Sequence, residues 1–383
     1  MKFKSIQLLL FFTLLLVAGC SPTLPVATQL PAIDPTPGST AALPGVESAV
    51  PTEAVPEITA IPGQIAVNPL TGLPVQDASL LAKRPVIVKV QNVPRESRPQ
   101  WGLSQADHVY EYYIEYGDTR FAAVYYGTRP EQIGPVRSAR HFDMQLIEMY
   151  QAVLLYGGAY EDLEQEMLSS EFGNRLIREG QNTAQVFYRF EPVGTNYLMA
   201  NITQLDAVYD FYGIEEIQPE FPDILFSESP DSEGLPADVV RVRFSGSMYN
   251  RWDYDPVSKR YYRSSEVVSG IDEKYAPLYD RGNGEQIAAD NLVVIFTRYN
   301  QVPDFNEVFD VPLAGSGTAY GVRDGQIFEL VWTRDESGGI FTLTNKDGTP
   351  YAFKPGNTWF SILGSQSKVV QQERNWQFIM YMP

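Results

Sequence analysis

The sequence predicts an α/β domain followed by a mostly antiparallel β domain, both behind a disordered N-terminal tether. β-branched runs alternate with helix-like stretches up to about residue 217, and strands interleaved with helices are typical of an α/β layer. Short strand-like runs separated by Asp-Gly and Pro-Gly turns fill the remainder, as in β domains. Residues 21–67 contain nine Pro but no Lys, Arg or aromatic residue, so this segment cannot offset the entropy of ordering.

The first twenty residues predict a lipid anchor. Lys2 and Lys4 precede an apolar stretch of 13 residues, which is shorter than the about 20 residues of a permanent membrane span. The stretch ends in Val17-Ala18-Gly19-Cys20, which resembles a bacterial lipobox. In that processing the peptide is cut before Cys20 and the sulfur receives a diacylglycerol. We therefore expect a signal peptide over 1–19 and a lipidated Cys20, since two or more acyl chains (palmitate among them) anchor stably.

Composition shifts divide the remaining chain. Residues 20–67 would be the lipidated Cys and a Pro/Thr-rich tether that lifts the body off the membrane. An acidic stretch with four Pro, at about 218–237, predicts a linker between an α/β domain over 68–217 and a β-rich domain over 238–383. The body would then lie on the extracytoplasmic face of the cell membrane.

In the first domain we expect three strands, over 85–91, 107–116 and 120–126, the last two forming a hairpin. A helix follows over 137–150, then a strand over 152–156 and a helix over about 160–168. A further helix is expected from about Thr195, with Leu198, Ile202, Leu205 and Tyr209 on one face. In the second domain the expected strands are 239–244, 249–254, 260–263, 291–297, 308–313, 317–322, 326–333, 340–344, 359–362 and 376–380.

Charge and composition exclude several classes of function. Lys+Arg 29 against Asp+Glu 47 gives a net charge of −18, which argues against a nucleic-acid partner. A single Cys excludes a disulfide framework, and two His leave little for a zinc site. We expect neither a metal nor a cofactor.

Several motifs resemble the YerB-like lipoproteins, a bacterial domain family of unknown function. The first-module motifs are NPLTGLPV (68–75), RPQWGLSQADHVYE (98–111), TRF (119–121) and IGPVRSAR (133–140). The second-module motifs are YDPVSKRYYR (254–263), NLVVIF (291–296), LAGSGTAYG (313–321) and KPGNTWFSI (354–362). The resemblance implies a membrane-anchored, extracytoplasmic two-domain lipoprotein, and it supplies no reaction.

The segment 134–141 (GPVRSARH) is the candidate ligand site. If the helix begins at Pro135 or Val136, Arg137 and Arg140 lie in its first turn, beside free backbone N–H groups. An anion could be held there by both guanidinium groups, with Ser138 between them. Arg98 and Arg120 are secondary candidates. The alternative is internal pairing of Arg137 and Arg140 with carboxylates, of which the candidates are Glu111, Glu115, Asp107 and Asp143.

Two carboxylates, Glu111 and Glu115, suggest a hydrolase as the alternative function. Strand alternation would put Glu111 and Glu115 on one face, with either as general acid or base and Arg137 orienting the substrate. Their backbones would lie roughly 13 Å apart, however, whereas the paired carboxylates of glycosidases lie about 5–9.5 Å apart. A triad of Ser138, His141 and Asp143 is also conceivable, but Asp143 would face away from His141 on a helix.

Taken together, these features predict a binding or scaffolding module in the cell envelope. Its partner would be an anionic envelope component, such as a cell-wall component, or an envelope protein. The membrane contact would be made through lipidated Cys20. A solute-binding protein serving a transporter is a third possibility, which the single linker makes less favoured.

Overall fold

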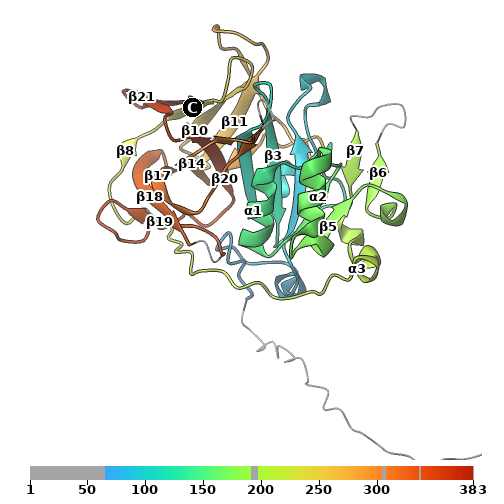
Figure 1. The fold of residues 1–383 in the computed structure, drawn as a ribbon. Helices are drawn as coiled ribbons and strands as arrows, with labels where there is room; N and C mark the ends of the chain where they lie inside the picture. Colours follow the sequence, from blue (N-terminus) through green and yellow to red (C-terminus); the bar gives the residue numbers. More distant parts are fainter. Residues whose placement is uncertain (1–64, 191–196, 304–307, 336–337, 383) are drawn as a thin grey trace, which may run out of the picture. The chain divides into compact units, whose positions relative to one another are not determined.

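The computed structural model describes residues 65–190, 197–303, 308–335 and 338–382 (Figure 1). The predicted signal peptide, Cys20 and all but the last three residues of the predicted tether lie outside the described residues.

An 11-stranded sheet runs through both halves of the sequence. Its order is β19-β18-β17-β14-β20-β2-β3-β1-β4-β5, with β8 paired to β18. The halves meet where β2 pairs in parallel with β20, from His108 opposite Thr358 to Tyr112 opposite Ile362. The strands are β1 (Val86–Gln91), β2 (His108–Tyr113), β3 (Thr119–Tyr125), β4 (Val153–Tyr156), β5 (Leu176–Arg178), β8 (Leu235–Pro236), β14 (Asn291–Thr297), β17 (Gly315–Arg323), β18 (Gln326–Arg334), β19 (Thr342–Asn345) and β20 (Thr358–Gly364).

β1 is an interior strand of this sheet and is buried on both faces. It pairs antiparallel with β3 and parallel with β4, and every residue of VIVKVQ is buried. A strand covered on both faces is a nearly continuous apolar run. Lys89 and Gln91 are the two polar exceptions, and alternation puts both on the same face. That face carries the candidate site.

A second sheet of seven strands belongs to the C-terminal half. Its order is β12-β11-β10-β9-β22-β21, with β13 paired to β11. These strands are β9 (Val239–Arg243), β10 (Tyr249–Asp255), β11 (Arg260–Glu266), β12 (Tyr275–Pro277), β13 (Ala288–Ala289), β21 (Lys368–Gln372) and β22 (Asn375–Ile379). Two small pairs complete the strands, namely β6 (Phe187–Arg189) with β7 (Leu198–Ala200) and β15 (Asn300–Gln301) with β16 (Phe309–Asp310).

The described α-helices are α1 (His141–Tyr150), α2 (Glu161–Ser169) and α3 (Asp206–Tyr212). Figure 1 shows α1 and α2 side by side over the half of the sheet that contains β3. α1 buries Phe142, Leu146 and Ile147. The short 3₁₀ helices are Ala78–Ala82, Arg95–Ser97, Leu103–Gln105, Gly173–Arg175, Gln181–Thr183 and Ile202–Gln204.

Two helix predictions are wrong over their amino-terminal parts. The helix predicted from residue 137 begins at His141, because the backbone before it pairs with the sheet: Arg137 N donates to Lys89 O (2.8 Å). Arg137 and Arg140 are therefore not in its first turn. The helix predicted from Thr195 is also wrong over Leu198–Ala200, which is β7; Ala200 N donates to Ile133 O (2.8 Å). The predicted start at Thr195 lies outside the described residues, and from residue 201 onward the helical parts are the 3₁₀ helix Ile202–Gln204 and α3. At β7, strand partners distant in sequence override the local periodicity.

The predicted fold class is confirmed. Helices alternate with the parallel strands β1, β4 and β5 in the first half, and most strand pairs of the second half are antiparallel. The strands predicted at 239–244, 249–254, 291–297 and 326–333 correspond to β9, β10, β14 and β18. The prediction over 308–313 is too long, since only Phe309–Asp310 pairs. The domain boundaries 68–217 and 238–383 stay a prediction.

Candidate functional site

The site begins at the edge of the sheet where β1 and β4 end. These strands run parallel, so their carboxyl ends lie at the same edge, and ligands of open α/β sheets bind outside that edge. β3 runs antiparallel to β1, with Arg120 opposite Gln91, so the amino end of β3 lies there too. The chain leaves β4 through Gly157 and Gly158 and enters α2.

The predicted segment 134–140 is extended along this edge. Gln91 N donates to Pro135 O (2.9 Å), and Gly157 N donates to Arg137 O (3.0 Å). Ala139 N donates to Gly158 O (2.8 Å). The segment is thus fixed to the ends of both parallel strands, and its side chains are positioned by the sheet rather than by a helix.

Three predicted arginines converge here. Arg120 Nη1 donates to Ser138 O (2.7 Å), and Arg140 Nη1 donates to Ala139 O (2.7 Å). Burial lowers the pKa of Arg137, and the guanidinium groups of Arg120 and Arg189 lower it further. The guanidinium groups therefore concentrate positive charge at this edge, and each disfavours the charged form of its neighbours.

Carboxylates of the chain neutralise part of this charge. Arg140 forms a two-point ion pair with Glu115, in which Nε lies 2.7 Å from Oε2. Asp143 accepts from Tyr112 OH (2.7 Å) and from Lys89 Nζ (3.1 Å), all buried. Internal pairing, the alternative to ligand binding, is thus present at Arg140.

The first turn of α1 does not offer a free anion cradle. Asp143 Oδ2 accepts from Arg140 N (2.7 Å), so a side chain of the helix itself occupies this position. The conceivable triad is not assembled either. The His141 ring is hydrogen-bonded through Nε2 to Tyr160 OH, while Asp143 bonds Lys89 and Tyr112.

Two features of this edge lack neighbours within the described residues. The Gln91 side chain is fully buried, and within the described residues neither its amide nitrogen nor its amide oxygen has a hydrogen-bond partner. Its register partner Arg120 places it on the arginine face of the sheet. Gly158, with φ +137°, has no heavy atom within 4 Å of the position a Cβ would take. Orphaned buried amides are rare, so a water or ligand is the expected partner.

The predicted catalytic pair is not brought together. β2 ends at Tyr113, so the expected alternation does not reach Glu115. Glu111 lies on the face of the larger sheet opposite to the one that carries Arg120 and Gln91. There its Oε2 contacts Arg263 Nη2 (2.9 Å) and Asn250 Nδ2 (3.0 Å). Burial raises the pKa of Glu111, and Arg263 opposes that rise. The two carboxylates contact different arginines, and this arrangement gives no support to the hydrolase alternative.

Arg98, a secondary candidate, is committed elsewhere. Its Nη2 lies 2.7 Å from Glu266 Oε1, and its Nε donates to Asn92 O (2.8 Å). Its side chain is 9% exposed, which leaves little guanidinium surface for a ligand.

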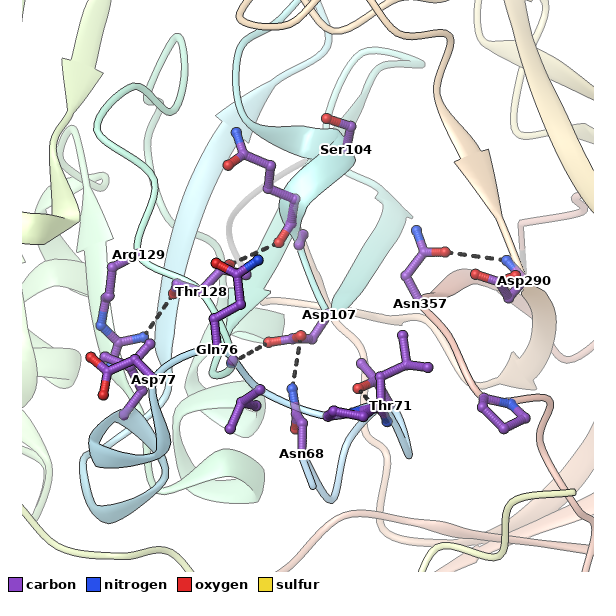
Figure 2. A pocket seen from close by; sticks show the side chains of 18 of the residues that line it. Asn68, Thr71, Gln76, Asp77, Ser104, Asp107, Thr128, Arg129, Asp290 and Asn357 are labelled. Carbon is purple, nitrogen blue, oxygen red and sulfur yellow. Dashed lines mark hydrogen bonds between the residues drawn. The ribbon is translucent and has the colours of Figure 1, made fainter. Parts of the chain in front are cut away.

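A large polar pocket, which sequence reasoning missed, lies between the two halves (Figure 2). Its volume is about 840 Å³. Its polar lining includes Asn68, Thr71, Gln76, Asp77, Asp107, Arg129, Asp290 and Asn357. Asp107 accepts from Asn68 Nδ2 (2.9 Å) and from Gly127 N (3.0 Å), and burial raises its pKa to about 6. The polar residues at 68–77 are the signal that could have indicated it.

Comparison with known proteins places the chain in a family. Residues 70–214 match the N-terminal domain of a protein family of unknown function (DUF3048), and residues 240–360 match its C-terminal domain. The chain belongs to this YerB-like family. YerB of Bacillus subtilis (strain 168), named as a lipoprotein, is 28% identical over 303 residues, covering 77% of this chain and 85% of YerB. The crystal structure of Bacillus subtilis YerB matches with a TM-score of 0.65 at 26% identity, covering 78% of this chain and 96% of that one.

Two further properties of this YerB-like chain concern metals and membranes. Among the described residues, no three or more His, Cys, Asp or Glu side chains gather as metal ligands would. Within the same part of the chain, no helix has the length and apolar character to cross a membrane.

Proposed function

We propose that this YerB-like protein is a lipid-anchored binding module on the extracytoplasmic face of the membrane. Its anchor would be the predicted diacylglyceryl Cys20, which agrees with the naming of Bacillus subtilis YerB as a lipoprotein. Its ligand would be an anionic envelope component, such as a cell-wall polymer, or an acidic segment of an envelope protein.

The observation that carries this proposal is the convergence of Arg120 and Arg137 at the carboxyl edge of β1 and β4. Arg120 donates to the carbonyl of Ser138, which holds its guanidinium group against the extended segment that carries Arg137. A carboxylate or phosphate would gain charge-assisted hydrogen bonds there, each worth about 1.5–3 kcal/mol. Arg140 lies beside them and is paired with Glu115.

Co-sedimentation with purified cell-wall sacculi tests the proposal, using the full chain in detergent. We expect Arg120→Ala/Arg137→Ala to weaken binding by at least about tenfold, and added salt to weaken wild-type binding. Arg374→Ala is the matched control, because Arg374 is 57% exposed and pairs only with Asp238 among its described ion pairs. Thermal melts verify that each variant is folded.

Two outcomes would overturn the proposal. Equal binding by wild type and the double variant would remove these arginines from the site. Fragments released into the supernatant by the wild type, and lost in Glu115→Gln, would favour the hydrolase instead.

A further inference from the structure

A second, apolar cavity is lined by residues of β19, by Phe360 of β20 and by the segment 350–353 that precedes β20. Its volume is about 250 Å³. Its apolar lining includes Leu70, Ile340, Phe341, Leu343, Phe353 and Phe360. All six are buried or half-buried, and Phe341 packs edge-on against Phe360 with ring centroids 5.5 Å apart.

One wall of the cavity is a strap from the segment that the sequence predicts as a linker. Residues 222–225 of this strap line the cavity. It is held at one end by Phe353, whose N donates to Leu225 O (2.8 Å) and whose O accepts from Ser227 N (2.9 Å). At the other end the Phe221 ring packs against Tyr126, with centroids 5.7 Å apart. The strap is thus anchored on both sides of the cavity.

The polar groups of the lining fit a neutral guest better than an anionic one. His108 Nε2 bonds Leu70 O (2.9 Å) and Nδ1 bonds Tyr150 OH (2.7 Å), so both ring nitrogens are satisfied by the protein. Burial lowers the pKa of His108 to about 4, which keeps the ring uncharged at neutral pH. Asp223 is the acidic residue of the lining, and the lining contains no Lys or Arg.

From this arrangement we propose that the cavity binds a hydrocarbon chain of roughly eight to ten carbons that carries an uncharged polar head. An apolar cavity of about 150 Å³ accommodates benzene, so one of 250 Å³ has room for roughly ten carbons. Side chains around an unfilled apolar space lack dispersion partners, and an apolar guest supplies them. Asp223 disfavours a carboxylate head by like-charge repulsion. This site is separate from the arginine edge and does not depend on the function proposed there.

Calorimetric titration of the full chain with 1-octanol and with octanoate tests the proposal; the chain is kept in a steroid-based detergent such as CHAPS, which has no alkyl chain to compete for the cavity. We expect 1-octanol to bind the wild type at least tenfold more tightly than octanoate. Leu343→Trp fills the cavity and should abolish 1-octanol binding. Leu168→Trp is the matched control, since Leu168 is 55% exposed on α2 and should leave binding unchanged.

A charge reversal keeps the test decisive even if Leu343→Trp fails to fold. Asp223 is exposed on the strap, so Asp223→Lys should fold and should shift the preference toward octanoate. Absence of 1-octanol binding to the wild type would overturn the proposal, as would equal 1-octanol binding by folded Leu343→Trp. An unchanged preference in Asp223→Lys would overturn the assigned head-group chemistry.

Discussion

Lys89 is a fully buried lysine, and its protonation should make the stability of the protein depend on pH. Burial lowers the pKa of its ammonium to about 7, whereas an unfolded lysine titrates near 10.4. Between pH 7 and 9 the unfolded state therefore binds more protons than the folded state, and stability rises with pH. The Lys89 contribution to the free energy of unfolding should grow by about 2 kcal/mol over this range.

Urea denaturation of wild type and Lys89→Met at pH 7, 8 and 9 measures this contribution. The difference in free energy of unfolding between wild type and Lys89→Met should change with pH. This difference isolates Lys89, because the other titrating groups are common to both proteins. Lys346→Met is the control, since Lys346 is 65% exposed and should show the wild-type profile. Parallel profiles for wild type and Lys89→Met would show that Lys89 keeps its ordinary pKa.

The hairpin between β17 and β18 shows what local sequence can specify at the level of an element. Asp324-Gly325 predicts a tight turn, and both residues have positive φ (50° and 73°), as a type I′ turn requires. Gly325→Ala should lower stability by about 1 kcal/mol or more, because Ala is strained at this φ. Its Cβ would also lie 2.8 Å from the Tyr254 ring.

Thermal melts check this prediction. Gly246→Ala is the matched control, since no heavy atom lies within 4 Å of its added Cβ and its φ lies outside the positive range. We expect a lower Tm for Gly325→Ala and an almost unchanged Tm for Gly246→Ala. Equal Tm values would show that the turn tolerates an L side chain.

The segment before α1 shows where local sequence fails. Turns such as Asp324-Gly325 depend on residues adjacent in the chain, so the sequence predicts them. The extended backbone at Arg137 depends on Lys89 O and Gly157 N, which are far away in sequence. Of the residues that the sequence proposes for the site, Arg120, Arg137 and Ser138 lie together and Arg98 lies elsewhere, and the strand geometry that holds them has no local signal. The partners of Glu111 come from the other half of the chain and had no local signal.

At the scale of the whole molecule, the two halves are joined by buried charge as well as by the shared sheet. Glu111 lies on β2 of the larger sheet, and Arg263 lies on β11 of the second sheet. Arg263 also lies over the Trp359 ring, 4.5 Å from its centroid. Asp280 adds a second link, accepting from Gly102 N (3.0 Å) and Ser104 N (2.9 Å). Because neither sheet keeps its polar groups satisfied alone, we expect both halves to unfold together.

Arg263→Met tests this coupling. It leaves Glu111 buried without its cation, which should cost about 3–5 kcal/mol at neutral pH. The loss should shrink at acidic pH, where protonation removes the uncompensated charge, and burial already raises the pKa of Glu111. Glu111→Leu/Arg263→Met should recover part of the stability, since no charge remains unpaired. Arg260→Met is the control on the same strand; Arg260 is 36% exposed, and its contact with Asp290 is 3.4 Å long.

Urea unfolding followed by circular dichroism and by tryptophan fluorescence distinguishes coupled from independent unfolding of the two halves. If the pair couples the halves, both signals of Arg263→Met shift together to lower urea and remain coincident. If instead each half is stable alone, the signals separate into two transitions, and the shared sheet would not be the cooperative unit. A loss in Arg263→Met no larger than in Arg260→Met would show that Glu111 finds another partner or water. The part of the Arg263→Met stability loss that disappears at acidic pH then measures how much of the link between the halves is electrostatic.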